Sequence, residues 1–190
     1  MKILLTGGAG YIGSHTALSL IDNGHSVTVI DNLITGNKML IPAKAKHYNF
    51  DIADENSIQK ILKENKFDIA IHFAGLTRVD ESIKYPEKYQ LHNFEKSKIF
   101  FSLCIKNNLK KIIFSSSAGV YGNSNSNSLT EDSELKPINP YADSKYQIEN
   151  FLIEISKKDK VDYTILRYFN VAGADKSNRS GLIAKSSSNL

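Results

Sequence analysis

The chain has 190 residues, a length that excludes a long multidomain assembly. It is 41% hydrophobic and 23% charged, an ordinary globular composition that excludes a chain too polar to fold. Its net charge of +4 comes from scattered pairs such as Lys110-Lys111 and forms no continuous stripe, so we expect no nucleic acid partner. The chain has one cysteine, Cys104, which excludes a disulfide framework and a metal site built from cysteines. No apolar run approaches bilayer length. We therefore expect a folded cytoplasmic protein with no metal site and no membrane partner.

Short apolar runs alternate with helical patterns along the chain. The pattern predicts, in order, a strand at 3–5, a helix at 11–23, strands at 27–30 and 48–50, a helix at 54–65 and a strand at 69–73. A long helix at 86–107, a strand at 111–114, a helix at 140–156 and a strand at 163–167 complete the series. Strands separated mostly by helices are typical of a parallel sheet covered on both faces, so we predict an α/β fold with a doubly wound sheet.

Several boundaries carry local signals. Asn139 can cap the helix that begins at Pro140, and Gly24 can end the first helix in a left-handed conformation. Residues 122–136 are rich in Asn and Ser and predict a long loop. Long loops in compact domains are usually functional or disordered, so by its position this loop is a candidate to lie over a site.

The first predicted strand runs into a glycine-rich turn. Gly8, Gly10 and Gly13 satisfy the Gly-x-Gly-x-x-Gly pattern, and Gly7 extends it. The pattern alone also fits a purely structural turn, but here a strand precedes it and an amphipathic helix follows, so backbone N–H groups and a helix N-terminus would face a pyrophosphate. Asp31 follows the second strand, where a carboxylate accepts hydrogen bonds from adenosine ribose hydroxyls and repels the extra phosphate of NADP. We therefore predict a Rossmann-like domain that prefers NAD.

Tyr141 and Lys145 are four residues apart and share one face of a predicted helix. Ile148 and Leu152 continue that face, so Lys145 lies on an apolar stripe, an unusual place for a solvated lysine. A nearby ammonium lowers the pKa of a tyrosine toward a value useful for proton abstraction. An isolated pair would more simply be a core tyrosine beside a snorkelling lysine. Ser117, at the end of the fifth strand, favours the catalytic interpretation because its hydroxyl could bond the substrate oxygen.

The candidate residues gather at one edge of the predicted sheet. The glycine turn, Asp31, the Phe73-Ala74-Gly75 run, Ser117 and Asn170 each follow or end a predicted strand. Ligands of open parallel sheets bind outside the carboxyl ends of the strands, so the agreement of these strand ends is stronger evidence than any one motif.

Taken together, these motifs resemble the extended short-chain dehydrogenase/reductase family, and within it the enzymes that epimerise UDP-hexoses at carbon 4. The residues that carry the resemblance are 6–15, 31–33, 72–76, 115–118 with 120–122, 139–141 with 144–145, and 167–170. Related dehydratases usually carry acidic residues just after the catalytic hydroxyl, whereas Ala118 and Gly119 stand there in this chain.

The resemblance assigns residues to three roles. It implies that NAD is held by Gly7, Gly10, Tyr11, Ile12, Gly13, Asp31, Asn32, Leu33, Thr35, Gly36, Asp51, Ile52, Phe73, Ala74, Gly75, Leu76, Thr77, Asn93, Ser117, Tyr141, Lys145 and Phe169. It implies that Ser117, Tyr141 and Asn170 contact a UDP-sugar, and that Ser117, Tyr141 and Lys145 are catalytic.

The reaction implied is the interconversion of UDP-glucose and UDP-galactose, a step of galactose metabolism. Tyr141 would take the proton of the sugar 4-hydroxyl while hydride moves from carbon 4 to NAD, and the 4-keto sugar would then receive hydride on its other face. Ser117 would polarise the oxygen, and Lys145 would hold the cofactor ribose and tune Tyr141. The helices at 86–107 and 140–156 look like the pair that forms a homodimer in this family, because each has enough apolar residues for two contacts.

The chain departs from the family pattern in two respects. Thr77 stands where many members carry lysine, which removes a positive charge near the cofactor. The family also continues beyond Asn170 into a second domain, so we expect residues 1–173 to be the NAD-binding domain and 174–190 the start of a truncated substrate-binding region, with impaired activity for the fragment. Two alternatives stay open: another nucleotide-sugar dehydratase, decarboxylase or epimerase of this family, or a non-catalytic NAD-binding fragment.

Overall fold

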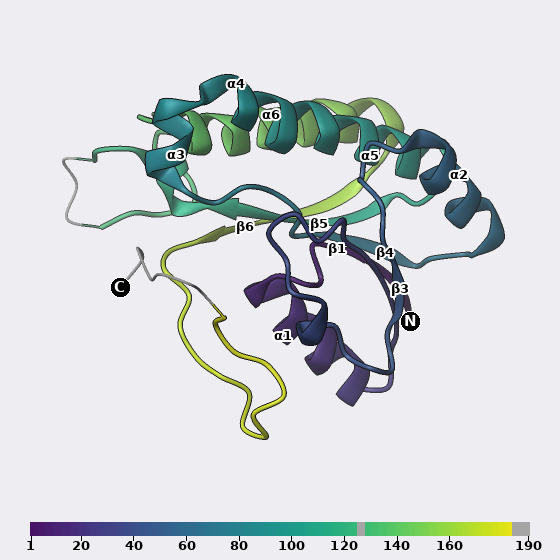
Figure 1. Ribbon diagram of the computed structural model, residues 1–190. Coiled ribbons are helices and arrows are strands. Elements are labelled where there is room, and N and C mark those ends of the chain that lie inside the picture. Colours follow the sequence, from purple (N-terminus) through teal and green to yellow (C-terminus); the bar gives the residue numbers. More distant parts are fainter. Residues whose placement is uncertain (125–127, 184–190) are drawn as a thin grey trace.

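The protein folds as an open parallel sheet with helices on both faces (Figure 1). The structure, a computed structural model, describes residues 1–124 and 128–183. Within these residues the sheet contains β1 (Lys2–Thr6), β2 (Ser26–Ile30), β3 (Lys46–Tyr48), β4 (Ile69–His72), β5 (Lys111–Ser117) and β6 (Asp162–Tyr168), all parallel, in the order β3-β2-β1-β4-β5-β6. The predicted doubly wound Rossmann-like fold is confirmed.

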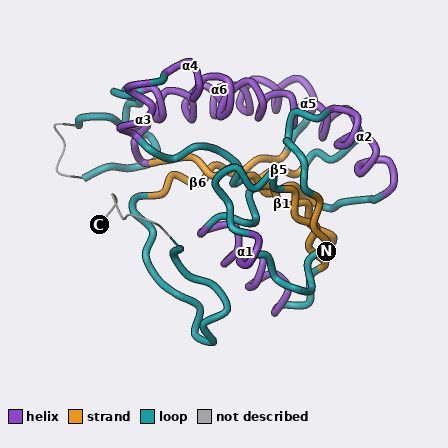
Figure 2. The backbone as a smooth tube through the Cα atoms, viewed as in Figure 1, coloured by secondary structure: helices purple, strands orange, loops and turns teal. Residues whose placement is uncertain are grey.

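Helices cover the sheet unequally. The described helices are α1 (Tyr11–Asp22), α2 (Glu55–Glu64), α3 (Val79–Lys84), α4 (Pro86–Tyr89), α5 (Lys96–Lys106) and α6 (Pro140–Asp159). Figure 2 shows α1 on one face of the sheet, whereas α2 to α6 lie on the other. Strand order reverses between β1 and β4, so the carboxyl ends of these two strands flank the crevice where ligands of such sheets bind.

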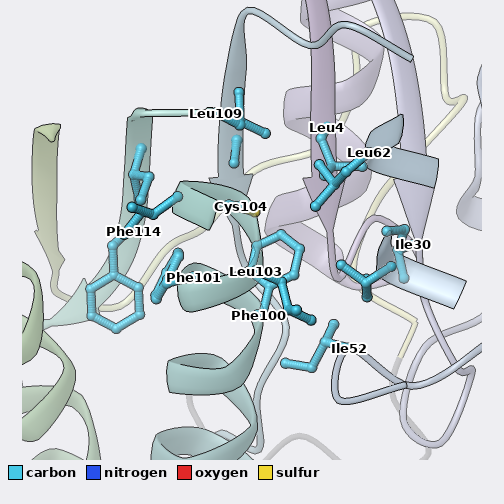
Figure 3. Packing of buried hydrophobic residues seen from close by; sticks show 14 of the residues in the cluster. Leu4, Ile30, Ile52, Leu62, Phe100, Phe101, Leu103, Cys104, Leu109 and Phe114 are labelled. Atoms are coloured by element: carbon cyan, nitrogen blue, oxygen red, sulfur yellow. The ribbon is translucent and has the colours of Figure 1, made fainter. Parts of the chain in front are cut away.

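The alternation of side chains along β1 explains the two layers. Leu4 points into the larger core with residues of α2, α5 and α6, whereas Ile3 and Leu5 point toward α1. Phe100 and Phe101 of α5 are fully buried in the larger core (Figure 3). Because both faces of β1 are buried, its apolar run is continuous rather than alternating.

The predicted helix boundaries of α1 and α6 have the expected chemistry. The Asn139 side chain accepts a hydrogen bond from the Ala142 N–H at 2.9 Å, and Pro140 occupies the first turn. Gly24, just after α1, has a φ of 78°, and no atom lies within 4 Å of the place that a Cβ would take. These two predictions are confirmed.

The structure corrects two predicted elements and adds a third. The long helix predicted at 86–107 is α4, a π-helical segment at Gln90–Glu95 and α5 in succession. The third strand spans Lys46–Tyr48 rather than 48–50, because the chain leaves the sheet at Phe50 to line the pocket described below. The short α3 had no predicted counterpart, since six residues are too few for a clear helical period.

After β6 the chain folds back against α1. The Ser180 and Ser14 hydroxyls share a buried hydrogen bond of 2.7 Å, and Arg179 pairs with Asp22 at 2.8 Å. Among residues 1–124 and 128–183, none of the helices is long and apolar enough to cross a membrane.

Candidate cofactor and active site

A pocket with a cavity volume of about 100 Å³, open to solvent, lies at the carboxyl edge of the sheet. The predicted residues that line it are Gly7, Gly10, Asp31, Asn32, Thr35, Gly36, Asp51, Ile52, Phe73, Ala74, Gly75 and Leu76. The lining residues that sequence reasoning missed are Ile30, Ile34, Phe50, His92 and Lys96.

The glycine turn forms one wall of the pocket because only glycine fits there. Gly7 has a φ of 74°, and a Cβ on it would lie 2.5 Å from the Ala74 backbone nitrogen. A Cβ on Gly13 would lie 2.2 Å from the Gly7 carbonyl oxygen. The turn therefore presents bare backbone at the start of α1, where Tyr11 and Ile12 begin the helix. A phosphate can approach such a surface closely, so this wall fits the pyrophosphate of a dinucleotide.

Asp31 connects the glycine turn to the end of β2. Its Oδ2 accepts a hydrogen bond from the Ala9 N–H at 2.9 Å, and its Oδ1 accepts one from the Leu33 N–H at 2.8 Å. Leu33 takes a φ of 60° to make this contact. Each carboxylate oxygen still has an acceptor position for a ribose hydroxyl. The Asp31 side chain therefore fits the predicted role.

Asn93 supports the opposite wall. It is 2% exposed, its Oδ1 accepts from the Leu76 N–H at 2.7 Å, and its Nδ2 donates to the Leu76 carbonyl at 3.0 Å. The same Nδ2 donates to the Ser144 hydroxyl at 3.2 Å, which ties this wall to α6. Asn93 thus acts on the pocket through Leu76 without lining it, whereas Thr77 is exposed and lies outside the lining.

Ser117 and Tyr141 come together at the end of β5. The Ser117 hydroxyl oxygen accepts a hydrogen bond from the Gly119 N–H at 3.1 Å. Burial raises the pKa of Tyr141 above its ordinary value of 10.0, and the nearby Ser117 hydroxyl partly opposes this shift. The predicted lowering of the Tyr141 pKa is therefore wrong for this structure.

The environment of Lys145 gives the physical reason. Its Nζ donates to the Ser115 carbonyl at 3.0 Å and lies 5.1 Å from the centre of the Phe114 ring. The side chain is buried, and this burial lowers the pKa of the ammonium to about 8. Its charge is directed at a carbonyl oxygen of β5, and burial dominates the pKa of Tyr141.

His72 links the strands and the helix behind the pocket. It is fully buried and shares hydrogen bonds with the Thr6 hydroxyl at 2.7 Å and the Ser97 hydroxyl at 2.8 Å. Burial, and secondarily the Lys145 charge, lowers the pKa of His72 to about 3, so the ring is neutral at physiological pH. This histidine supports the pocket without acting as a proton donor to it.

A buried ion pair that sequence reasoning missed anchors the serine block. Glu149 is fully buried, pairs with Arg167 at 2.8 Å and accepts a hydrogen bond from the Ser116 hydroxyl. Arg167 also donates to the Tyr121 hydroxyl and to the Glu131 carbonyl of the long loop. The spacing of Glu149, four residues after Lys145, was the available signal.

Phe169, predicted to contact NAD, and Asn170, predicted to contact the UDP-sugar, lie outside the pocket lining. Phe169 is 72% exposed and Asn170 is also exposed, just after β6. The structure thus assembles the cofactor wall and the Ser117–Tyr141 pair, but it does not bring Phe169 or Asn170 into contact with them.

Known proteins share this arrangement. A sequence model of the NAD dependent epimerase/dehydratase family matches residues 3–190. A UDP-glucose 4-epimerase of Lactobacillus helveticus is 42% identical over 181 residues, covering 95% of this chain and 55% of that protein. A crystal structure of UDP-glucose 4-epimerase superposes with a TM-score of 0.97 at 35% identity, covering 100% of this chain and 58% of the other. The UDP-glucose 4-epimerase of Bifidobacterium longum in complex with NAD+ and UDP gives a TM-score of 0.92 at 35% identity, with 98% and 58% covered. The chain therefore spans little more than half the length of these relatives.

The low pKa of Lys145 predicts a pH dependence of stability. Because the folded-state pKa of about 8 lies below the reference value of 10.5, the unfolded chain binds more protons between these values, and the free energy of unfolding rises with pH across that window. Relative to Lys145→Met, which lacks the group, the wild type should gain about 3 kcal/mol from pH 8 to 10.5, since one pKa unit corresponds to about 1.4 kcal/mol. Urea unfolding followed by circular dichroism measures this difference. A difference that stays constant with pH would contradict the assignment.

Proposed function

The chain belongs to the NAD-dependent epimerase/dehydratase family, and on this premise we propose that it binds NAD and carries the catalytic side chains of a UDP-hexose 4-epimerase. The observation that carries the proposal is that the pocket lined by the glycine turn and Asp31 and the Ser117–Tyr141 pair both lie at the carboxyl ends of neighbouring strands of one sheet. The epimerase relatives with bound NAD+ or UDP support it.

Each wall of the pocket has a part in holding NAD. The bare backbone of the glycine turn suits the pyrophosphate, and the Asp31 carboxylate suits the adenosine ribose hydroxyls while repelling a 2′-phosphate. The Lys145 ammonium lies beside Gly75 of the pocket lining, since a Cβ on Gly75 would lie 3.5 Å from its Nζ. It can therefore reach the ribose at the nicotinamide end. NAD, when bound, supplies the acceptor for the hydride of the sugar.

The Ser117–Tyr141 pair would handle the sugar oxygen. The phenolate form of Tyr141 would act as the general base for the 4-hydroxyl proton and become the phenol, and the Ser117 hydroxyl would donate a hydrogen bond to the same sugar oxygen. Burial raises the pKa of Tyr141, and Lys145, whose Nζ donates to the Ser115 carbonyl, does not offset that rise in this structure.

The substrate and the division of the chain belong to the same proposal. UDP-glucose and UDP-galactose are the substrates we propose, as a step of galactose metabolism, with Asn170 as a further substrate contact. Residues 1–173 would form the NAD-binding unit and 174–190 would begin the substrate-binding region. The last strand of the described sheet, β6, ends at Tyr168, which supports a boundary shortly after it. The single buried cysteine suits a reducing cytoplasm.

A homodimer through α5 and α6 is part of the same proposal. Leu91 is 51% exposed and Phe94 is partly buried, both in the π-helical segment that leads into α5, and Phe151 on α6 is also partly buried, so apolar surface is left on this segment and on α6. Helices that pack on the sheet and expose further apolar residues commonly contact a second partner.

Cofactor choice tests the role of Asp31. We expect NAD to bind at least about tenfold more tightly than NADP, because the 2′-phosphate meets the Asp31 carboxylate. Asp31→Ala should lower the affinity for NAD and reduce the preference for NAD over NADP. Glu64 is an exposed acid at the end of α2, and Glu64→Ala should leave both affinities unchanged. Isothermal calorimetry measures the affinities, and equal affinity of the wild type for the two dinucleotides would overturn the assignment.

Proton transfer tests the role of Tyr141. In a preparation that interconverts UDP-glucose and UDP-galactose, Tyr141→Phe should lower turnover at least about a hundredfold, the low end for loss of a general base, while bound NAD is kept. Tyr146→Phe on the same helix is the matched control and should keep wild-type turnover. Near wild-type turnover of Tyr141→Phe would show that another group carries the proton.

Light scattering at micromolar protein tests the dimer. We expect twice the chain mass of 21.2 kDa, since the exposed apolar residues of the two helices would be buried between copies. A strictly monomeric mass would refute this part of the proposal.

A further inference from the structure

An ion pair crosses one end of the pocket. The Lys96 Nζ lies 2.6 Å from the Asp51 Oδ2, and both side chains line the pocket. Asp51 stands on the segment that follows β3, whereas Lys96 begins α5 directly after the π-helical segment. The pair therefore joins two walls that come from segments far apart in the sequence.

The order of the strands indicates which part of a dinucleotide this end receives. The glycine turn follows β1 and faces the pyrophosphate, and Asp31 follows β2 and faces the adenosine ribose. Asp51 follows β3, the next strand outward from β2. When NAD is bound, the adenine base would therefore lie beside Asp51 and Lys96.

The hydrogen bonds that Asp51 already accepts leave few acceptor positions on its carboxylate for a ligand. Its Oδ2 accepts from Lys96 and from the Asn32 Nδ2 at 3.0 Å, and its Oδ1 accepts from the Ala53 N–H at 2.9 Å. A carboxylate has about four acceptor positions, two on each oxygen. Both positions on Oδ2 are filled, so Oδ1 keeps the single open position.

The pair is poorly suited to a purely structural role. The Lys96 and Asp51 side chains are 19% and 30% exposed, so solvent reaches this partly buried pair and reduces its contribution to stability. Burial opposes ionisation of Asp51, but the hydrogen bonds from Lys96 and the Ala53 backbone outweigh it and keep the pKa of this carboxyl below its ordinary value. Asp51 is therefore held as an anion that accepts and cannot donate.

We propose that Lys96 is the positioning residue for the base end of the pocket, where it fixes Asp51 so that its one open acceptor position selects a 6-aminopurine over a 6-oxopurine. This inference rests on the proposed NAD binding. An exocyclic amino group can donate to the Asp51 Oδ1, whereas a 6-oxo group would place an acceptor against an acceptor. Without Lys96 the carboxylate keeps only the hydrogen bonds from the Asn32 side chain and the Ala53 N–H, so it is held less firmly and its selectivity falls.

The test compares NAD with its deaminated analogue, nicotinamide hypoxanthine dinucleotide, by calorimetry. The wild type should prefer NAD by about tenfold or more, the size expected for base-edge hydrogen bonds. Lys96→Met and Lys96→Gln should each reduce the preference to less than about threefold, and Lys96→Arg should restore it because a guanidinium can still pair with Asp51. Lys98→Met, an exposed lysine on the same helix, is the matched control and should keep the wild-type preference.

A second readout separates positioning from general stability. In an NMR titration of side-chain carboxyls, the pKa of Asp51 should rise in Lys96→Met and stay at its wild-type value in Lys98→Met. A wild type that binds neither dinucleotide would contradict the proposed function itself. Binding of NAD with an unchanged preference in Lys96→Met, or an unchanged Asp51 pKa, would overturn the role of Lys96 alone.

Discussion

The close approach of the glycine turn to the chain after β4 is the constraint on which the site depends. A Cβ on Gly7 or on Gly13 would overlap backbone atoms, so both positions must lack a side chain for β1, α1 and the turn at Phe73–Ala74 to meet. This contact brings the ends of β1 and β4 together at the point where strand order reverses. The remaining walls of the pocket are built around that junction, by Asp31 from β2 and by the Leu76 turn held by Asn93.

Helix α6 provides the second organising element, because it carries charge into the core at regular intervals. Tyr141, Lys145 and Glu149 lie one turn apart along it, and each is paired with β5 through Ser117, Ser115 and Ser116, in that order. Three consecutive serines of β5 thus each interact with a residue from a different turn of α6. A buried Lys145 with a pKa near 8 and a buried Glu149 paired with Arg167 are costly to place, and the strand and its partners compensate for that cost.

Features set by local sequence could be predicted, and features set by distant contacts could not. Apolar runs revealed the buried strands, the glycine spacing revealed the turn, and the four-residue spacing revealed Tyr141 and Lys145 on one helix face. The π-helical segment at Gln90–Glu95 has no periodic signature, so the placement of Lys96 opposite Asp51 was invisible in the sequence. The direction of the Tyr141 pKa was also missed, because burial, which depends on the whole fold, dominates it.

The central claim is that one pocket, formed by the ends of β1, β2 and β4 and the chain after β3, holds the dinucleotide. Amide chemical shifts of the ¹⁵N-labelled chain during titration with NAD test this most directly. The account predicts that the largest shifts fall at the glycine turn, at Asp31–Gly36, at Asp51 and Ile52, and at Gly75 and Leu76. Largest shifts in the separate hollow beside α1, lined by Leu18, Ile21 and Met39 among others, would contradict it.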